Sequence, residues 1–348
     1  MKDLKYICAY TIPFMAIIGI WLHGIYTYLT PIYAFGVIPI LELFTNSSSK
    51  NIDGNHKILQ SKKKIFDWML YFNLPMVYGI LLFAIYTCTS SNLDTYEVVG
   101  IIISLGIVLG SNGINVGHEL GHRFTKERYI GKALLLPSLY MHFYIEHNFG
   151  HHLKVATKED PATARYNQPV YLFWITSTIR QYISAWKIQL KLLNQNNQAF
   201  FSIKNDMLWY FLITIIYLML LTYFFGLYGL LVAILSGITG FLLLETINYI
   251  EHYGLVRTKT SSGRYERVKE IHSWNSNHTL GRIMLYELTR HSDHHHRASK
   301  KYQILDHHDN SPQLPFGYPT SMVISLLPPL WFWIMNKRVP REMKVYKR

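Results

Sequence analysis

Long stretches without any charged side chain constrain this chain more than any other feature. Tyr6 to Leu41 contains no Asp, Glu, Lys or Arg over 36 residues, and Met207 to Leu244 contains none over 38. About 20 apolar residues suffice for a helix to cross a bilayer, so each of these tracts fits two spans. A water-soluble helix would need a polar face, which such tracts do not offer. The sequence therefore predicts an all-α integral membrane protein.

Two shorter tracts, Trp68 to Leu93 and Val98 to Gly117, bring the expected number of transmembrane helices to six. The N-terminal tract is longer than the apolar part of a cleavable signal peptide, so it is interpreted as the first span. The expected spans cover approximately residues 6–28, 29–44, 66–88, 97–117, 207–225 and 228–247.

The basic residues predict the orientation. The three short connections on one side, near Ile25–Thr30, Thr87–Tyr96 and Phe225–Tyr228, contain no Lys or Arg, so all 34 basic residues lie on the other side. Lys and Arg collect on the cytoplasmic side of membrane proteins, and both termini are therefore expected in the cytoplasm. Residues 118–206 and 248–348 would form a cytoplasmic cap rich in histidine, and residues 1–348 a single membrane-embedded domain.

The overall composition excludes several classes of protein. Half of the residues are hydrophobic and 16% are charged, which is unlike a disordered chain or most water-soluble enzymes. Cys8 and Cys88 form no CxxC pair, so no disulfide framework, iron–sulfur site or zinc knuckle is encoded. The net charge of +13 agrees with contact to anionic lipid and to an acidic partner protein. No nucleic-acid partner is expected.

Histidines gather in clusters that follow the apolar tracts. In His118-Glu-Leu-Gly-His122 the two imidazoles are four residues apart, which places them on one helical face. In an α-helix, His147 and His151 likewise share a face, whereas His152 is rotated about 100° further. These imidazoles could serve two different metals or one site at a helix end.

Two further histidine motifs lie in the second half of the chain. His291, His294 and His295 share a helical face, and His296 points about 140° away from His291. His252 stands alone in the segment NYIEHYG, at the end of the last apolar tract. The other isolated histidines are interpreted as ordinary surface or hydrogen-bonded residues, namely His23, His56, His142, His272, His278, His307 and His308.

The number of clustered imidazoles exceeds what one metal ion needs. HELGH alone also fits a zinc peptidase with Glu119 as base, but such a site uses three protein ligands and leaves most histidines unexplained. A site with two metal ions uses them, and imidazole suits iron, zinc and copper. Nearby carboxylates could accept the distal ring N–H groups and offset the positive charge, and the candidates are Glu119, Glu146, Asp160, Glu251 and Asp293.

Together these motifs resemble those of a known family, the integral-membrane non-haem di-iron alkane 1-monooxygenases. The motifs are HELGH, EHNFGHH followed by KVATKEDPA, NYIEHYGL and RHSDHH, with Lys301-Tyr-Gln and Leu314-Pro-Phe-Gly-Tyr318 downstream. NYIEHYG is the informative one, because it is typical of alkane and xylene hydroxylases rather than of the more distantly related fatty-acid desaturases. The resemblance extends from about residue 100 to 340.

The resemblance implies both a ligand set and a reaction. Two iron ions would convert O2, a substrate C–H bond, two electrons and two protons into an alcohol and water. Medium-chain n-alkanes are the default substrate, and rubredoxin or a ferredoxin, with its NAD(P)H-dependent reductase, the electron source. The implied location is the bacterial inner membrane. The implied iron ligands are His118, His122, His147, His151, His152, His252, His291, His294 and His295.

Other functions remain possible at this point. Methyl aromatics or terpenoids would use the same iron chemistry, and a desaturase or hydroxylase of acyl chains would use related clusters. A metal transporter would carry its histidines inside the spans rather than at their ends. Small residues such as Gly106 and Gly237 could open a substrate path between helices, but contact between helices is the more frequent role of such residues.

Overall fold

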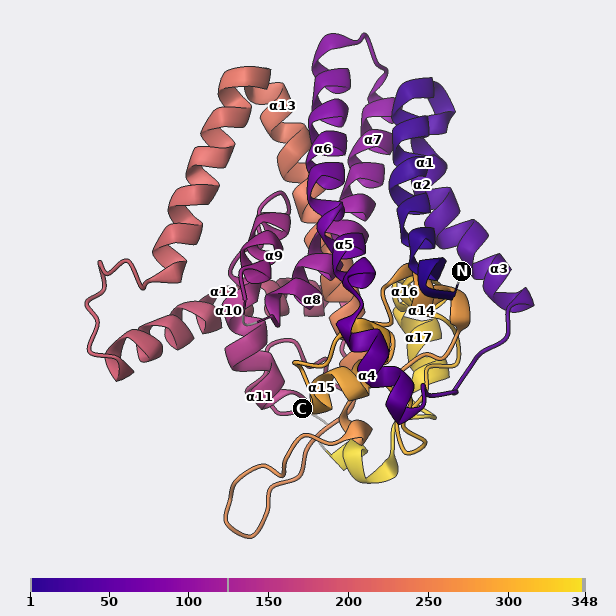
Figure 1. The fold of residues 1–348 in the computed structure, drawn as a ribbon, viewed down its shortest axis with the longest axis vertical. Helices are drawn as coiled ribbons and strands as arrows, with labels where there is room; N and C mark the ends of the chain where they lie inside the picture. The colour runs from indigo at the N-terminus through magenta and orange to yellow at the C-terminus, as the bar shows by residue number, and fades with distance from the viewer. Residues whose placement is uncertain (1, 124, 346–348) are drawn as a thin grey trace. The chain divides into compact units, whose positions relative to one another are not determined.

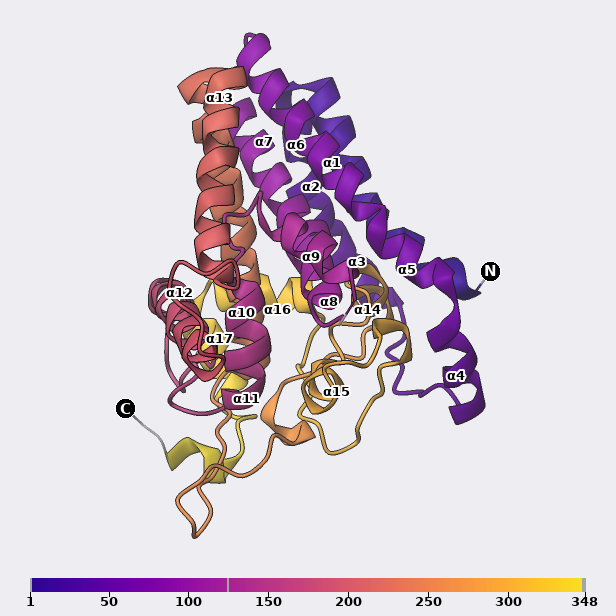
Figure 2. The same cartoon turned by 60° about the vertical axis from the view of Figure 1, so that its left-hand side comes forward.

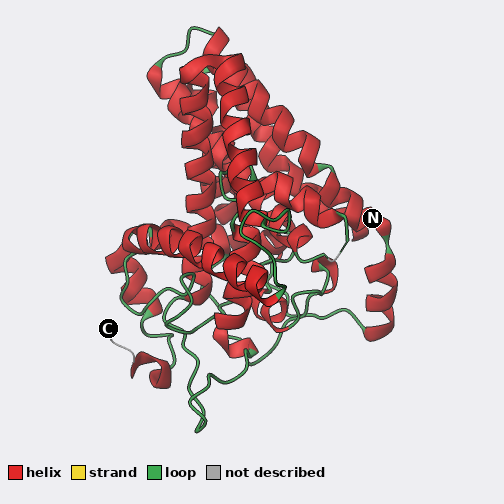
Figure 3. Cartoon of the chain, turned by 90° about the vertical axis from the view of Figure 1, so that its left-hand side faces the viewer, coloured by secondary structure: helices red, strands yellow, loops and turns green. Residues whose placement is uncertain are grey.

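The computed structural model describes residues 2–123 and 125–345. These residues form helices that are joined by loops (Figure 3). Within this described part only isolated β-bridges occur, and no strand is formed. The prediction of an all-α chain is therefore confirmed.

The α-helices are α1 (Thr11–Leu22), α2 (Leu29–Ile32), α3 (Ile38–Phe44), α4 (Gly54–Lys62), α5 (Lys64–Tyr71), α6 (Asn73–Ser90), α7 (Thr95–Val108), α8 (Asn115–Gly121), α9 (Glu127–Leu135), α10 (Phe143–Glu146), α11 (His152–Lys154), α12 (Val170–Gln195), α13 (Asp206–His252), α14 (Thr279–Met284), α15 (His291–His296), α16 (Tyr318–Ser325) and α17 (Pro328–Met335). The 3-10 and π turns are η1 (Lys2–Tyr10), η2 (Gly24–Tyr28), η3 (Tyr33–Val37), η4 (Leu109–Ile114), η5 (His147–His151), η6 (Glu270–His272), η7 (Tyr302–Ile304) and η8 (Arg341–Val345).

Five helical segments in the described residues are long and apolar enough to cross a membrane: Asp3–Leu22, Gly24–Phe44, Lys64–Ser90, Thr95–Gly121 and Asp206–His252. The last of these, α13, has 47 residues and would be about 70 Å long if straight, more than twice a hydrocarbon core of about 30 Å. Its backbone leaves the helical conformation at Gly226 (φ 65°, ψ −175°), where the helix turns back on itself (Figure 1). Helix α13 therefore consists of two helical segments, one before and one after Gly226. Whether each of them crosses the membrane, which would give six crossings, stays a prediction.

The first two apolar segments separate earlier than expected. The boundary was predicted near residue 28, but α1 ends at Leu22 and the next turn begins at Gly24. His23 and Gly24 both have positive φ angles, 59° and 58°, and the His23 N–H donates to the Gly19 carbonyl oxygen at 3.2 Å. The backbone reverses here because this pair closes the helix with a left-handed turn.

The chain forms two compact units, each assembled from segments distant in sequence. The first comprises Met1–Val37, Lys64–Glu146 and Tyr182–Leu244. Its helices α1, α6 and α7 lie side by side (Figure 2). A cluster of buried side chains in this unit includes Tyr140, Phe143 and Tyr210.

The second unit comprises Ile38–Lys63, His147–Gln181 and Glu245–Arg348. Buried polar contacts, rather than strands, hold its long loops. The Trp274 indole N–H donates to the Tyr253 carbonyl oxygen at 2.9 Å, and the buried Arg290 guanidinium donates to the carbonyl oxygens of Leu305 (2.6 Å) and Lys50 (2.9 Å). These bonds satisfy buried backbone groups that helices would otherwise pair.

Glycines inside the helices of the first unit are points of close contact. A Cβ at Gly106 would lie 2.4 Å from the Thr239 side chain, and one at Gly237 would lie 2.8 Å from the Pro137 carbonyl oxygen. Neither position has room for a side chain. These glycines therefore allow close contact between helices, which is the more frequent role of such small residues.

A close approach between the backbones of α8 and α9 predicts a mutational effect. A Cβ at Gly131 would lie 2.8 Å from the Gly117 carbonyl oxygen and 3.1 Å from the Gly121 nitrogen. Because both are backbone atoms, Gly131→Ala should destabilise the protein by about 1–3 kcal/mol, measurable as a lower melting temperature in detergent. Gly79→Ala is the matched control, since a Cβ there meets nothing within 4 Å. Equal melting temperatures for the two variants would contradict this interpretation.

Candidate metal centre

Four buried histidines of the second unit form one possible metal site. His151 is on η5, His252 ends α13, and His291 and His295 are on α15. One nitrogen of each lies within 4.8 Å of the others. The Nε2 atom of His291 is 3.1 Å from Nε2 of His252 and 2.9 Å from Nε2 of His295. Two ligands about 2.1 Å from a metal and at right angles would be separated by about 3 Å, so these rings fit a shared ion.

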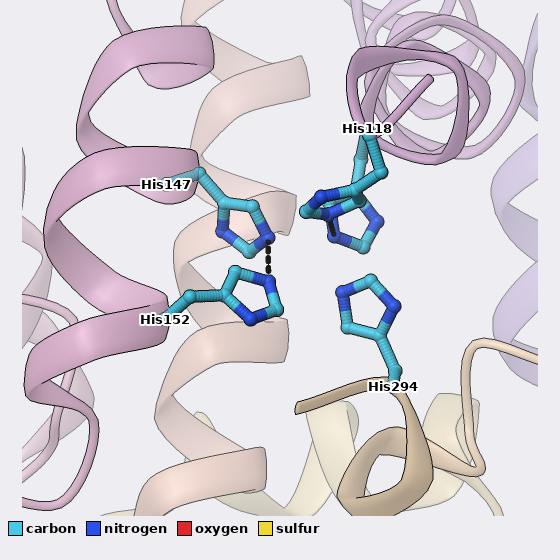
Figure 4. Close-up of side chains that lie close together, drawn as sticks. His118, His147, His152 and His294 are labelled. Atoms are coloured by element: carbon cyan, nitrogen blue, oxygen red, sulfur yellow. Dashed lines mark hydrogen bonds between the residues drawn. The ribbon is translucent and has the colours of Figure 1, made fainter. Parts of the chain in front are cut away.

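A second convergence in the same unit involves His147, His152 and His294, whose rings point toward one another (Figure 4). The Nε2 atoms of His147 and His152 are 3.0 Å apart. The ring centroid of His294 is 4.9 Å from that of His152 and 6.0 Å from that of His147. Three imidazoles can hold an ion but leave positions for further ligands.

The HELGH pair belongs to the first unit. The Nε2 atoms of His118 and His122 are 3.1 Å apart, as the spacing of four residues predicted. Helix α8 is buried along its whole length, and the Phe143 ring lies 6.1 Å from that of His118. The Arg123 guanidinium donates to Glu119 at 2.7 Å. A peptidase would need this carboxylate as its base, so the ion pair argues against the peptidase interpretation.

His147 and His151, which would share a face on an ideal α-helix, fall into different groups. The structure pairs His147 with His152 and places His151 in the four-histidine group. The reason is the π turn η5, in which backbone bonds run from residue i to i+5 and bring residues five apart together. An ideal α-helix, on which the expectation rested, would instead bring residues four apart together.

The third motif is also divided. His291 and His295 converge with a separation of 2.9 Å between their Nε2 atoms, as expected for residues four apart. His294 instead joins His147 and His152. One short helix, α15, therefore contributes to both groups. His296 lies in neither group and is exposed, 3.6 Å from Glu270.

Burial favours the neutral form of His294 and His295. Removal from water lowers the pKa of His294 to about 3, and burial together with the neighbouring histidines lowers the pKa of His295 well below its ordinary value. Neutral imidazole is the form that offers a lone pair to a metal ion, and a buried neutral ring can bind one without first losing a proton.

Two of the distal ring nitrogens in the four-histidine group have partners that orient the ring. The Nδ1 atom of His151 is 2.9 Å from a carboxylate oxygen of Asp160, which also accepts from the Thr163 hydroxyl. The Nδ1 atom of His252 faces the His272 carbonyl oxygen at 3.4 Å. Burial alone would raise the pKa of Asp160, but the charge and hydrogen bonds of His151 and Thr163 bring it below its usual range.

The remaining candidate carboxylates have different surroundings. Asp293 accepts from Lys300 at 2.5 Å and from His308 at 2.8 Å, so it anchors the loop after α15. Glu251 lies 3.2 Å from His291 and accepts from the Tyr318 hydroxyl at 2.8 Å. Glu146 is fully buried on α10.

Sequence reasoning missed several residues that support the site. Thr163, Tyr318 and the carbonyl of His272 touch the carboxylates or rings described above. His308 was interpreted as a surface or hydrogen-bonded residue, and it does form a hydrogen bond with Asp293. The only signal for any of them was the position of Tyr318 in the motif Leu314-Pro-Phe-Gly-Tyr318.

Removing the carboxylate behind His151 should weaken metal binding. Asp160→Ala takes away the acceptor of the His151 ring N–H, and loss of such a partner typically lowers metal affinity about 10–100-fold. Metal content after dialysis against a weak chelator measures the effect. Glu159→Ala, which changes an exposed neighbouring carboxylate, is the control. Equal retention of metal by the two variants would show that Asp160 has no such role.

Comparison with known proteins extends these observations. The family model described as fatty acid desaturase matches residues 95–323. Alkane 1-monooxygenase 2 of Alcanivorax borkumensis is 34% identical over 97% of this chain and 91% of its own length. Alkane 1-monooxygenase of Pseudomonas putida is 35% identical over 94% of this chain and 83% of its own length.

A more distant similarity is found with the hydroxylase component of a xylene/toluene monooxygenase of Pseudomonas putida, 29% identical over 79% of this chain and 74% of its own length. The family resemblance expected from the histidine motifs is confirmed. The chain belongs to the fatty acid desaturase family and, within it, to the alkane 1-monooxygenases.

Proposed function

We propose that this membrane enzyme hydroxylates the terminal carbon of medium-chain n-alkanes, with O2 as oxidant and rubredoxin as electron donor, at a histidine-ligated di-iron centre. The observation that carries the proposal is the convergence of buried histidines in two separate groups on a chain 34–35% identical to proteins named alkane 1-monooxygenase. The name of those relatives supplies the substrate class and the terminal position.

Nine histidines would hold the two ions. His151, His252, His291 and His295 form the first set. His147, His152 and His294 would belong to the second set together with the HELGH pair, His118 and His122, as the family resemblance implies. Imidazole ligands suit iron as they suit zinc and copper, and the choice of iron comes from the family resemblance. Bound iron would supply the activation of O2 and the insertion of one oxygen atom into a C–H bond.

The residues of the chain then have three tasks. Asp160 and the His272 carbonyl hold the distal N–H groups of His151 and His252, which keeps Nε2 of each ring free for a metal. All the proposed ligands are buried except His152, which is half-buried, and this burial excludes water that would quench an oxidant. The apolar helices would bring a substrate that dissolves in the bilayer to the site with one chain end forward.

The membrane arrangement belongs to the same proposal. The chain would cross the membrane six times, and α13 would supply two of these crossings, one before and one after Gly226. Both termini would then lie in the cytoplasm of a bacterium, and the histidines would lie at the cytoplasmic ends of the spans. The basic residues would then meet anionic lipid and a small acidic electron carrier. The carrier would be rubredoxin, or a ferredoxin, reduced by an NAD(P)H-dependent reductase.

The test is octane conversion by membranes that contain this protein, a rubredoxin, its reductase and NADH, with iron measured on the purified chain. Formation of 1-octanol with about two irons per chain is the expected result. Comparison of octane with dodecane and hexadecane tests the chain-length preference. One zinc ion per chain and no oxygen-dependent turnover would contradict the proposal.

A second candidate substrate class is methyl aromatics, which the similarity to the xylene/toluene monooxygenase component favours. Two irons per chain with oxidation of p-xylene but not of octane would select it. Terpenoid methyl groups and acyl chains are tested in the same assay, and a desaturated acyl product would identify the activity that the family model's name describes.

A further inference from the structure

The second half of α12 carries apolar side chains that face away from the protein. In the first unit, one face of this helix is buried through Ala185 and Gln189, which are four residues apart. Another face exposes large apolar side chains, namely those of Tyr182, Ile183 and Leu190. Helix α12 is not among the five segments of the described residues that are apolar enough to cross a membrane. Its apolar face therefore needs an explanation other than a transmembrane position.

The loop that follows α12, residues 196–205, continues this apolar face. The Phe200 ring stacks on the Trp186 ring of α12, with 6.1 Å between the ring centroids and 13° between the ring planes. Two further residues of the loop, Phe201 and Ile203, are 87% and 77% exposed. Grouped apolar side chains on a surface mark a site of contact with a protein or a membrane. We call these exposed side chains the α12–loop surface: Tyr182, Ile183, Leu190, Phe201 and Ile203.

Buried hydrogen bonds fix the backbone of this loop. The side-chain amide of Asn205, which is fully buried, donates to the Phe200 carbonyl oxygen at 2.9 Å. The side-chain amide of Gln189, on α12, donates to the Lys204 carbonyl oxygen at 3.0 Å. Breaking these bonds would leave buried polar groups without partners, so the loop cannot easily rearrange to cover its apolar side chains. The loop therefore presents them in a fixed position.

The start of α13 indicates what covers this surface. Helix α13 begins at Asp206, directly after the loop, and Met207 opens the charge-free tract that ends at Leu244. The end of α12 runs across the direction of this first segment of α13 (Figure 1). If the segment enters a bilayer at its start, the preceding loop lies at the bilayer surface and the end of α12 runs along that surface. Lipid can then cover the apolar side chains.

The charge of this region favours anionic lipid. No Asp or Glu occurs in residues 161–205, whereas Lys187, Lys191 and Lys204 are exposed. Lys191 directly follows Leu190, so a basic side chain lies beside the apolar face. Helices that lie in a membrane interface combine an apolar face with such basic residues. An acidic protein would also suit the lysines, but it would not account for apolar side chains beside the start of a membrane helix.

We propose that the α12–loop surface enters the membrane interface, with its apolar side chains among the acyl chains and Lys187, Lys191 and Lys204 against the phosphates of anionic lipids. The inference goes beyond the proposed function and does not depend on it, since it needs only that α13 enters the bilayer near Asp206. Lysine suits this boundary, because its apolar stem lies along lipid while its ammonium group stays among the headgroups.

The first experiment measures the depth of the loop. Phe201→Cys is made in full-length protein without the native thiols (Cys8→Ser, Cys88→Ala), labelled with a nitroxide and reconstituted in vesicles of phosphatidylcholine and phosphatidylglycerol. Collisions of the label with O2, which dissolves in lipid, are compared with collisions with a water-soluble nickel complex. The label is expected about 5–10 Å below the headgroup layer. Ser262→Cys, at an exposed polar position, is the control and should collide mainly with the nickel complex.

A label at position 201 that collides mainly with the nickel complex would overturn the proposal. Protection that appears only when a rubredoxin is added would show that the surface binds an acidic protein, and protection that depends on the ratio of protein to lipid would show that it binds a second copy of this chain. Both results also overturn the proposal. Ile203→Cys repeats the measurement if Phe201→Cys does not fold. None of these outcomes bears on alkane hydroxylation, which is tested separately.

The second experiment tests the lysines. The melting temperature of the wild-type protein should be higher in nanodiscs of phosphatidylglycerol than in nanodiscs of phosphatidylcholine, because basic residues are attracted to an anionic surface. The double variant Lys187→Gln/Lys191→Gln should reduce this difference. Lys259→Gln/Arg264→Gln is the control, since it removes the same charge from two other exposed positions. An equal reduction in the two double variants would overturn the assignment of anionic lipid to the α12 lysines.

Discussion

Changing His252 to alanine is expected to remove one metal ion from the protein and to lower hydroxylation more than about 100-fold, beyond the effect typical of a partner outside the ligand shell. His252 is fully buried, and its Nε2 atom is 3.1 Å from that of His291. A truncated side chain would leave three histidines and a gap in the shell. Metal analysis and alcohol formation by the same membrane preparation measure the two effects.

The control for this prediction is His296→Ala. His296 follows directly after His295, but it is exposed and lies outside both histidine groups. Its removal should leave the iron content unchanged. Full activity and full iron content in His252→Ala, in protein that inserts normally, would contradict the nine-histidine ligand set.

The second large effect is expected for Arg290→Met, and it concerns stability. The Arg290 side chain is 2% exposed and donates to the carbonyl oxygens of Leu305, Lys50 and, at 3.4 Å, Ser48. Methionine fills a similar volume but leaves these carbonyl oxygens without their donor. Each buried acceptor that loses its partner costs about 1–3 kcal/mol, so a total loss of about 3 kcal/mol or more is expected.

Because Arg290 directly precedes His291, the same change should release iron at a lower temperature. Thermal unfolding in detergent, followed together with iron release, checks both parts. Arg297→Met is the control, since Arg297 is an exposed arginine at the other end of α15. Equal melting temperatures for the two variants would show that the carbonyl contacts of Arg290 contribute little to stability.

The apolar part of the molecule was largely predictable because its cause is local. Tracts of 36 and 38 residues without charge leave few alternatives to membrane helices, and the described part of the chain is helical as expected. The boundaries were less predictable. The turn at His23 and Gly24 and the reversal at Gly226 depend on single backbone conformations, and apolar composition does not encode them.

The candidate site was predictable as a set of residues but only partly as a geometry. Spacing alone placed His118 beside His122 and His291 beside His295, since residues four apart meet on an α-helix. The pairing of His147 with His152 was not expected, because the π turn η5 changes the periodicity locally. Nothing in the spacing of α15 indicated that His294 would join a different group from its neighbours.

The sequence by itself thus determined that this is a helical membrane protein of a known enzyme family with more clustered imidazoles than one metal requires. Only the tertiary structure decided which histidines meet, that Asp160 lies behind a ring and that Glu251 lies beside His291. The physical reason is that helical periodicity fixes contacts within about one turn. The approach of segments about 100 residues apart depends instead on packing and on buried hydrogen bonds such as those of Arg290.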